Sequence, residues 1–353
     1  GARFNGVWRT ADWELIAGAD GQRSIHRGRM GMGRNTYKNE RWERDANFTQ
    51  YGLFAEYTQN LASNSQWISG ARVDQACAKD SRHADHHSRC SDLYSGFTRY
   101  EYDLSSDARA YVGIGHAQRF PDYWELFSGG EHAFAQIAPE KTTQLDVGFN
   151  YQKEALNLWW SGYAGYVQDY ILFRETEDHS GHGGGHGHGG KQNTAMNVDA
   201  LIAGSELGAG YQLSERWRTE NSLAWAWGEN RTNHRALPQM PPLEARLALT
   251  YEHDNWSAGA LWRLVAKQTR TAMGDGNVVG RDLEKSHGFA VLSLNGAYRL
   301  TEQVRVSSGI DNVLNKTYSE HLNLAGNGGF GFPGDRSFNE AGRIFWGRMD
   351  FSF

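Results

Sequence analysis

Residues 143–152 have the sequence Thr-Gln-Leu-Asp-Val-Gly-Phe-Asn-Tyr-Gln, in which larger side chains alternate with polar or small ones. Successive side chains of a β-strand point to opposite faces of the sheet, so this stretch predicts a strand with one apolar face and one polar face. Residues 243–252 and 256–264 repeat the pattern, and shorter versions of it occur through almost the whole chain. The sequence therefore predicts an all-β protein.

The connections between the predicted strands alternate between short and long. The short ones are residues 10–11, 61–65, 105–107, 154–156, 214–215, 253–255 and 301–302, and the long ones cover about 27–45, 78–92, 120–140, 175–197, 229–241, 270–286 and 314–341. In an antiparallel meander every second connection lies at the same end of the sheet. All short turns then share one end, which is typical of a transmembrane outer-membrane β-barrel. A soluble β-sandwich would show the same alternation along its strands but has no reason to sort its loops by length.

The composition of the 353 residues excludes several other classes of protein. No segment has the roughly 20 consecutive apolar residues that a membrane helix needs. Aromatic residues make up 13% of the chain, which argues against disorder. The formal net charge of −5 argues against a surface that neutralises phosphates, so we expect no nucleic-acid partner.

We count about fifteen strands, the first near residues 2–9. The last one ends at Phe353, and its apolar side chains share one face with Phe351 and Met349. A terminal Phe on such a strand is similar to the assembly signal of bacterial outer-membrane barrels, although an ordinary final strand would look the same. Single-chain bacterial barrels have even strand numbers. Because the count is odd and no signal peptide opens the chain, we expect it to be the C-terminal part of a larger barrel.

Three stretches resemble the barrel of TonB-dependent outer-membrane receptors. Residues 311–318, which include Asp311, Asn312 and Tyr318, resemble the signature before the last strand, and residues 139–144 and 238–243 resemble the starts of two barrel strands. The resemblance implies a barrel of about 22 strands, an N-terminal plug with a TonB box, and energy from the inner-membrane TonB complex. We see neither plug nor box in residues 1–353, which we expect to form only part of the barrel.

A fourth motif narrows the resemblance to the copper receptors of this family. Its residues are Arg119, Phe120, Pro121, Asp122, Tyr123, Trp124, Glu125 and Leu126. The resemblance implies copper as the transported ligand, with zinc as the alternative, and no obligatory cofactor. For Arg119 and Glu125 themselves we expect bonds within the loop and the lumen rather than catalysis.

Histidine and methionine are concentrated on the side of the predicted long loops. Only His253 lies at a predicted short turn, whereas the long loops and the strand ends next to them hold His26, His83, His86, His87, His116, His132, His179, His182, His186, His188, His234, His287 and His321. The same side holds Met30, Met32, Met196, Met240 and Met273. Imidazole binds copper and zinc, and thioether selects Cu(I). This placement predicts a surface that collects metal.

The densest predicted ligand group is the Gly-rich stretch of residues 175–190, with His179, His182, His186 and His188. Short His-rich tracts with carboxylates are typical of metal binding. Ordering such a loop costs about 1–2 kcal/mol per residue, so loose capture is expected rather than a rigid site. The alternative is a solvated low-complexity loop that binds metal only incidentally.

Two further groups are candidates. His83, His86 and His87 lie between Cys77 and Cys90. On an oxidising face we expect these cysteines to form a disulfide, with a Cys/His metal site as the alternative.

His26, Met30 and Met32 combine one imidazole with two thioethers at the end of an outward strand. They are candidates for a copper site that faces the plug, and the alternative is methionine scattered in a loop.

No enzyme motif is present: the chain lacks Gly-x-Ser-x-Gly, His-Glu-x-x-His, Cys-x-x-Cys and a phosphate-binding loop. We therefore expect a receptor for uptake of copper, or of zinc or a metal chelate such as a siderophore. A passive porin is the hypothesis from another class. The expected partners are outer-membrane lipid, the metal ion and, through the plug, the TonB complex.

Overall fold

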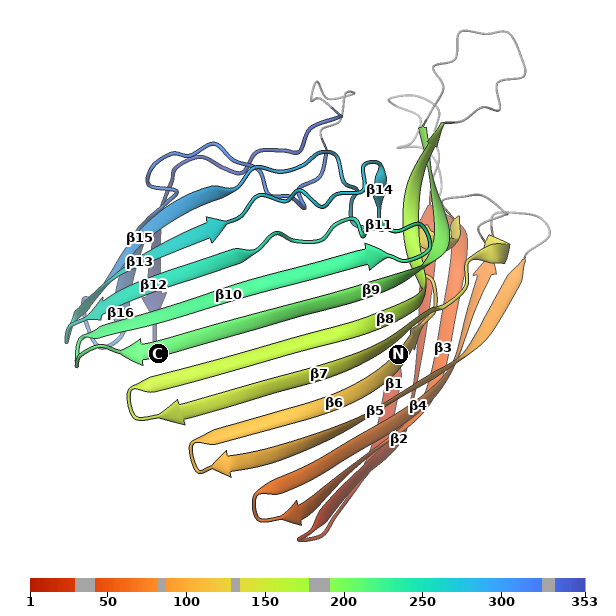
Figure 1. The fold of residues 1–353 in the computed structure, drawn as a ribbon, viewed down its shortest axis with the longest axis horizontal. Coiled ribbons are helices and arrows are strands. Elements are labelled where there is room, and N and C mark those ends of the chain that lie inside the picture. The colour runs from red at the N-terminus through yellow and green to blue at the C-terminus, as the bar shows by residue number, and fades with distance from the viewer. Residues whose placement is uncertain (29–41, 82–86, 128–133, 178–190, 326–333, 353) are drawn as a thin grey trace. The chain divides into compact units, whose positions relative to one another are not determined.

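The computed structural model describes residues 1–28, 42–81, 87–127, 134–177, 191–325 and 334–352 (Figure 1). All seventeen strands found in these residues belong to one sheet. They are β1 (Ala2–Arg9), β2 (Trp13–Gly28), β3 (Glu43–Ala62), β4 (Ser65–Asp80), β5 (Ser88–Ser105), β6 (Ala108–Arg119), β7 (Glu140–Lys153), β8 (Leu156–Glu177), β9 (Lys191–Gln212), β10 (Trp217–Asn230), β11 (Arg235–Ala236), β12 (Glu244–Glu252), β13 (Trp256–Val265), β14 (Asp275–Gly276), β15 (Phe289–Arg299), β16 (Val304–Asp311) and β17 (Ile344–Phe351). The short helix α1 (Tyr123–Phe127) lies between β6 and β7.

The all-β prediction is confirmed. The structure has seventeen strands in its described residues, against about fifteen predicted, and the two additional strands are short. β11 and β14 have two residues each, and the other fifteen strands have eight or more. Those two lie in long connections, where no period-two pattern marks them. In the part of the chain that the structure describes, no helix is long and apolar enough to cross a membrane.

The chain forms two compact units, which we describe separately. The first comprises Gly1–Tyr102, Val112–Leu145 and Tyr166–Asp199, and the second comprises Asp103–Tyr111, Asp146–Gly165 and Ala200–Phe353. In the first unit, β1 to β5 pair antiparallel, each with the next strand in the chain. In the second unit, β9, β10, β12, β13, β15, β16 and β17 pair antiparallel in this order, and the two-residue strands β11 and β14 fall between members of the series. Both units are antiparallel meanders.

The apolar faces of the strands are exposed, which separates a membrane barrel from a soluble sandwich. Leu247 of β12 lies opposite Trp262 of β13, and the two side chains are 40% and 49% exposed. A sandwich would bury such a face in its core, whereas a membrane barrel turns it to lipid. The neighbouring pair in the register, Arg246 and Arg263, belongs to the other, polar face.

The alternation of connection lengths is confirmed. Residues 10–12, 63–64, 253–255 and 300–303 form short turns between paired strands, and the connections after β10, β13 and β16 are long. Several strands extend further into the predicted long loops than expected: β8 and β9 have 22 residues each. A strand needs only about 9–11 residues to cross a membrane. The polar outer parts of these strands lack apolar alternation, so sequence periodicity does not mark them.

Glycine on the sheet makes room for aromatic side chains. A Cβ at Gly208 would lie 2.1 Å from Nε1 of Trp159, and one at Gly204 would lie 2.4 Å from the ring of Tyr163. The two aromatic side chains therefore lie across the neighbouring strand, where any larger residue would clash with them.

Candidate metal-binding surface

The connection between β6 and β7 is packed onto its neighbouring strands. Leu126 of α1 is fully buried in a cluster with Phe134 and Ile137 of the same connection. The other buried members of this cluster are Ile171 and Phe173 of β8, Ala78 of β4 and Ala195 of β9. Apolar contacts with strands distant in sequence therefore fix the position of α1, which is too short to be stable alone.

Arg119 and Glu125 hold this connection by hydrogen bonds. The two terminal nitrogens of Arg119 donate to the two carboxylate oxygens of Glu125 at 2.8 and 2.9 Å. Oε2 of Glu125 also accepts from the backbone nitrogen of Asp122 at 2.7 Å, while Oδ1 of Asp122 accepts from that of Glu125 at 2.9 Å. This reciprocal capping and the bidentate ion pair leave Glu125 3% exposed. Both side chains therefore serve the local structure.

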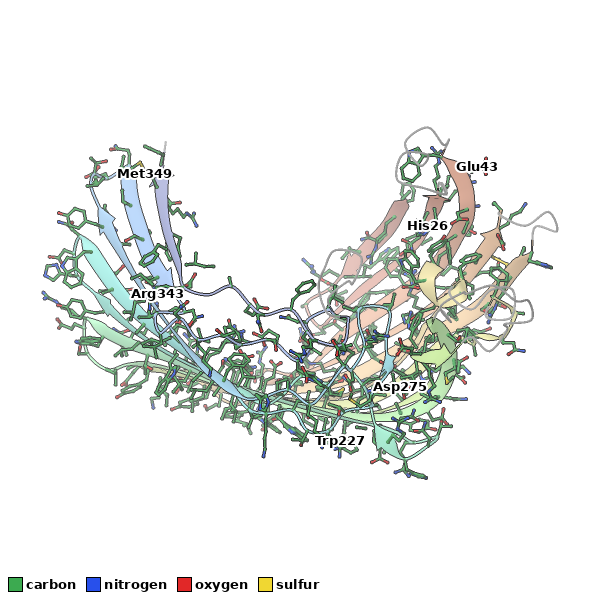
Figure 2. All side chains as sticks on the ribbon, turned by 90° about the horizontal axis from the view of Figure 1, so that it is seen from above. His26, Glu43, Trp227, Asp275, Arg343 and Met349 are labelled. Atoms are coloured by element: carbon green, nitrogen blue, oxygen red, sulfur yellow. A yellow bond between two sulfur atoms is a disulfide. The ribbon has the colours of Figure 1, made fainter. Side chains whose placement is uncertain are left out.

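His26, the predicted ligand near the end of β2 (Figure 2), contacts the same motif. Its ring stacks on Tyr123 with centroids 4.5 Å apart and planes 2° from parallel, and it meets the edge of Phe48 at 5.4 Å. The Tyr123 hydroxyl is hydrogen-bonded to Asp45. Stacking occupies the faces of the imidazole, whereas the nitrogen lone pairs lie in the ring plane. Met30 and Met32, the other members of this group, lie outside the described residues.

Cys77 and Cys90 are joined by a disulfide between β4 and β5. The two residues are direct partners in the strand register, with their Cα atoms 4.1 Å apart. Both sulfur atoms are thus engaged, and the Cys/His alternative has no free thiolate in this state. His87 is exposed just before β5, and His83 and His86 lie outside the described residues.

The structure does not describe the remaining predicted ligands. His179, His182, His186 and His188 lie outside the described residues. Among the residues that are described, no group of three or more His, Cys, Asp or Glu side chains is arranged to hold a metal ion.

Other histidines have different surroundings. His116 of β6 is hydrogen-bonded to Thr143 at 2.9 Å and to Gln118 at 3.1 Å. His234 is exposed in the long connection after β10. His253 lies in the short turn between β12 and β13 and stacks on Trp256.

Asn312 of the family motif shapes the start of the β16–β17 connection. It has a positive φ of 51°, its Nδ2 donates to the carbonyl of Lys316 at 2.8 Å, and its Oδ1 accepts from the nitrogen of Lys316 at 2.8 Å. Asn tolerates this left-handed conformation better than most residues because its short side chain bonds locally. Asp311 is the last residue of β16, Tyr318 packs on Phe289 at 4.2 Å, and Phe353 lies outside the described residues.

Sequence reasoning missed a buried carboxylate in the β13–β15 connection. Asp282 is 1% exposed and accepts hydrogen bonds from the nitrogen of Ala272 at 2.8 Å and from the nitrogen of Gln239 at 2.9 Å. Burial opposes ionisation, but His321 and these donors outweigh it and lower the pKa of Asp282. Nothing in the polar run around Asp282 distinguishes this residue, and Gln239 is 43 residues away.

Comparison with known proteins identifies the family. Residues 2–313 match the family described as TonB dependent receptor-like, beta-barrel. The chain belongs to this family, as the motifs predicted, and is part of a barrel of the bacterial outer membrane.

Solved structures and curated relatives give a finer comparison. The chain is 47% identical to the copper transporter OprC, with a TM-score of 0.92 over 99% of this chain and 56% of that one. It is 23% identical to the ferric enterobactin receptor of Pseudomonas aeruginosa over 86% of this chain and 42% of that protein. The ferric-catecholate import receptor Fiu of Escherichia coli K12, in its closed form, shares the fold with a TM-score of 0.70 and 14% identity, over 99% of this chain and 54% of that one. The chain thus spans about half the length of these proteins.

Proposed function

We propose that the receptor containing this chain takes up copper across the outer membrane. The observation that carries the proposal is the 47% identity to a copper transporter along 99% of the chain. The ferric-chelate receptors compared above have 23% identity or less. The copper-receptor motif at residues 119–126 and the soft and borderline ligands on the long-loop side support the same cargo.

In this proposal the chain supplies the wall and the external loops of the receptor. Imidazoles of residues 179–188 capture copper loosely at the outside, and His26 with Met30 and Met32 receives it closer to the lumen. A plug domain outside residues 1–353 completes the site and couples it to the TonB complex. In this proposal no catalytic residue is needed, because the metal is transferred by exchange of ligands.

The packed β6–β7 connection gives His26 a fixed position. Tyr123 stacks on His26 and is itself held through Asp45, while Arg119 and Glu125 brace the turn that carries Tyr123. A ligand that is held in place binds metal without an ordering cost at the moment of binding. The motif therefore contributes to binding through position, although it touches no metal itself.

Two alternative cargoes remain in the same class. Zinc would use the same imidazoles but gain little from thioethers. A ferric chelate is the cargo suggested by the names of the more distant relatives.

Titration of the purified full-length receptor tests the proposal. We expect Cu(I) to bind most tightly, with Zn(II) and a ferric catecholate failing to displace it at equal concentration. Met30→Ala with Met32→Ala should weaken Cu(I) binding at least tenfold. His253→Ala, at the short-turn end, is the matched control and should bind normally. Preferential binding of the ferric chelate would contradict the proposal, and large single-channel conductance would favour a passive porin instead.

A further inference from the structure

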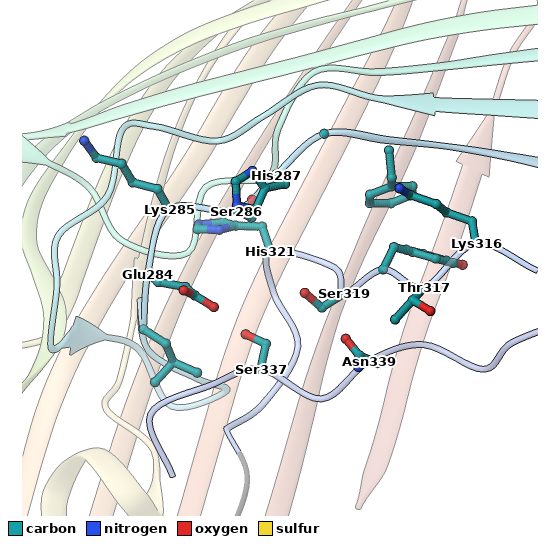
Figure 3. Close-up of a pocket in the computed structure, with 14 residues that line it drawn as sticks. Glu284, Lys285, Ser286, His287, Lys316, Thr317, Ser319, His321, Ser337 and Asn339 are labelled. Atoms are coloured by element: carbon teal, nitrogen blue, oxygen red, sulfur yellow. The ribbon is translucent and has the colours of Figure 1, made fainter. Parts of the chain in front are cut away.

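A cavity of about 310 Å³ lies in the second unit, within the size range of small-ligand sites (Figure 3). Residues of the β13–β15 connection and of the β16–β17 connection line it. Its wall includes the imidazoles of His287 and His321 and the oxygen-bearing side chains of Glu284, Ser319, Ser337 and Asn339. None of the residues that line it belongs to the His26 group or to residues 175–190, and the proposed uptake of copper does not use them.

His321 is the unusual residue of this wall. Its side chain is 2% exposed, and its Nε2 has no hydrogen-bond partner. Oδ1 of Asp282 lies 3.5 Å from this nitrogen, which is beyond good hydrogen-bond distance. Buried polar atoms are nearly always satisfied in native proteins, so Asp282 is the group toward which this buried nitrogen is held.

Asp282 is placed to orient this imidazole. Its two oxygens are fixed by donors from Gln239 and Ala272, so the carboxylate cannot turn away. Metal-binding histidines almost always direct one ring nitrogen at a carboxylate or carbonyl while the other binds the metal. Here Nε2 faces Asp282, and the ring itself lines the cavity, which leaves Nδ1 as the nitrogen for a ligand there.

His287, in the β13–β15 connection, supplies a second imidazole to the same cavity. Figure 3 shows His287, His321 and the carboxylate of Glu284 on one side of the cavity, while Lys316 lies toward the opposite side. The ammonium group of Lys285 points away from the two imidazoles in this view. The charges nearest the imidazoles thus permit a cation.

We propose that this cavity is an accessory site for a divalent metal ion of borderline softness, Cu(II) or Zn(II), with His287 and His321 as its nitrogen ligands. Such ions prefer neutral imidazole. Because no third His, Cys, Asp or Glu side chain of the described residues completes a metal group, water and the hydroxyl groups of the wall fill the remaining positions. Two protein ligands suit a site that exchanges its metal readily.

Cu(II) titration of the full-length receptor, followed by electron paramagnetic resonance, tests this site. His179, His182, His186 and His188 are first replaced by serine in every protein, so that they do not contribute to the signal. We expect a Cu(II) signal with two coupled nitrogens, and His287→Ala should lower the affinity of that site at least tenfold. His287 is exposed, so this variant keeps the fold. His234→Ala, an exposed histidine of another long connection, is the matched control and should change nothing.

Variants of His321 and Asp282 distinguish a metal ligand from a residue that positions it. His321→Gln should remove one nitrogen coupling, and Asp282→Asn should weaken Cu(II) binding by about 10–100-fold, as carboxylates behind metal-bound histidines do. Unchanged Cu(II) and Zn(II) binding in both His287→Ala and His321→Gln would overturn the proposal. So would binding of inorganic phosphate in place of metal, since the lysines would then define the site. Copper uptake by cells is measured separately, so failure of this site leaves the uptake proposal standing.

Discussion

At the scale of single residues, two ionisable side chains of the long connections allow direct tests: Glu125, which is buried, and Tyr318, which is half-buried. Glu125 accepts three hydrogen bonds while almost fully buried. Tyr318 combines burial with neighbouring negative charge from Glu320 and Glu340. Each makes a prediction that is confined to its own connection.

Replacement of Glu125 by alanine should loosen the β6–β7 connection without unfolding the sheet. Removing one partner of a fully buried ion pair costs roughly 3–5 kcal/mol. Arg119 is partly exposed and can regain water, so we expect a smaller loss of about 2 kcal/mol. Hydrogen exchange of the backbone nitrogens at 122–126 measures it. Glu302→Ala, in an exposed short turn, should leave these rates unchanged, and equal protection in the two variants would contradict the account.

Tyr318 predicts a loss of stability at alkaline pH. Burial, and then the charges of Glu320 and Glu340, raise the pKa of its hydroxyl. A raised pKa in the folded state means that stability is complete below the ordinary tyrosine pKa of about 10 and falls as pH rises through the folded value. Exchange protection in residues 312–325 should therefore fall above about pH 10. Tyr318→Phe should keep its protection there, and the same loss in that variant would show that another group is responsible.

At the scale of elements, apolar alternation predicts the membrane-crossing parts of the strands. It does not predict elements whose structure depends on contacts with residues distant in sequence. The strand at 143–152 lies within β7, and the short turns lie where the alternation breaks. α1 was not predicted, because Leu126 is stabilised by β8, which is distant in sequence. The contact of His321 with Asp282 was also not predicted, since both residues belong to unremarkable polar runs.

The disulfide should stabilise the outer end of the β4–β5 pair only. Closing a loop of this length is worth about 3 kcal/mol in the chain-entropy description. Cys77→Ser with Cys90→Ser should raise the rate of protease cleavage near residues 82–86 and leave insertion into the membrane unchanged. Folded yield of the full-length receptor in outer membranes is the second readout. Loss of insertion would show that the whole sheet depends on this bond.

A charged side chain on the lipid-facing side of β12 should destabilise the folded receptor. Leu249→Arg places a cation on the exposed apolar face, which costs about 2–4 kcal/mol near the middle of the bilayer. Ala248→Arg is the matched control, because residue 248 belongs to the polar face and lies opposite Glu220. Urea unfolding of the full-length receptor in lipid vesicles gives the two stabilities. A smaller loss for Leu249→Arg than for Ala248→Arg would mean that the faces are assigned the wrong way round.

At the scale of the whole molecule, the family and the barrel follow from sequence patterns, whereas the ligand set does not. The motifs at 311–318 and 119–126 identify the family from sequence alone. Each forms a specific local structure, namely the turn at Asn312 and the capped start of α1. A metal site depends instead on side chains that meet in space. His26 is fixed by Tyr123, whereas its proposed partners Met30 and Met32 lie outside the described residues.

Accumulation of radioactive copper in cells that express the full-length receptor tests the central claim most directly. The account predicts that at limiting copper the receptor raises accumulation well above that of cells without it. Collapsing the proton-motive force should abolish the gain, and deletion of residues 179–190 should reduce it. Accumulation that does not depend on the receptor, or that persists at the full rate without the proton-motive force, would contradict energised copper uptake.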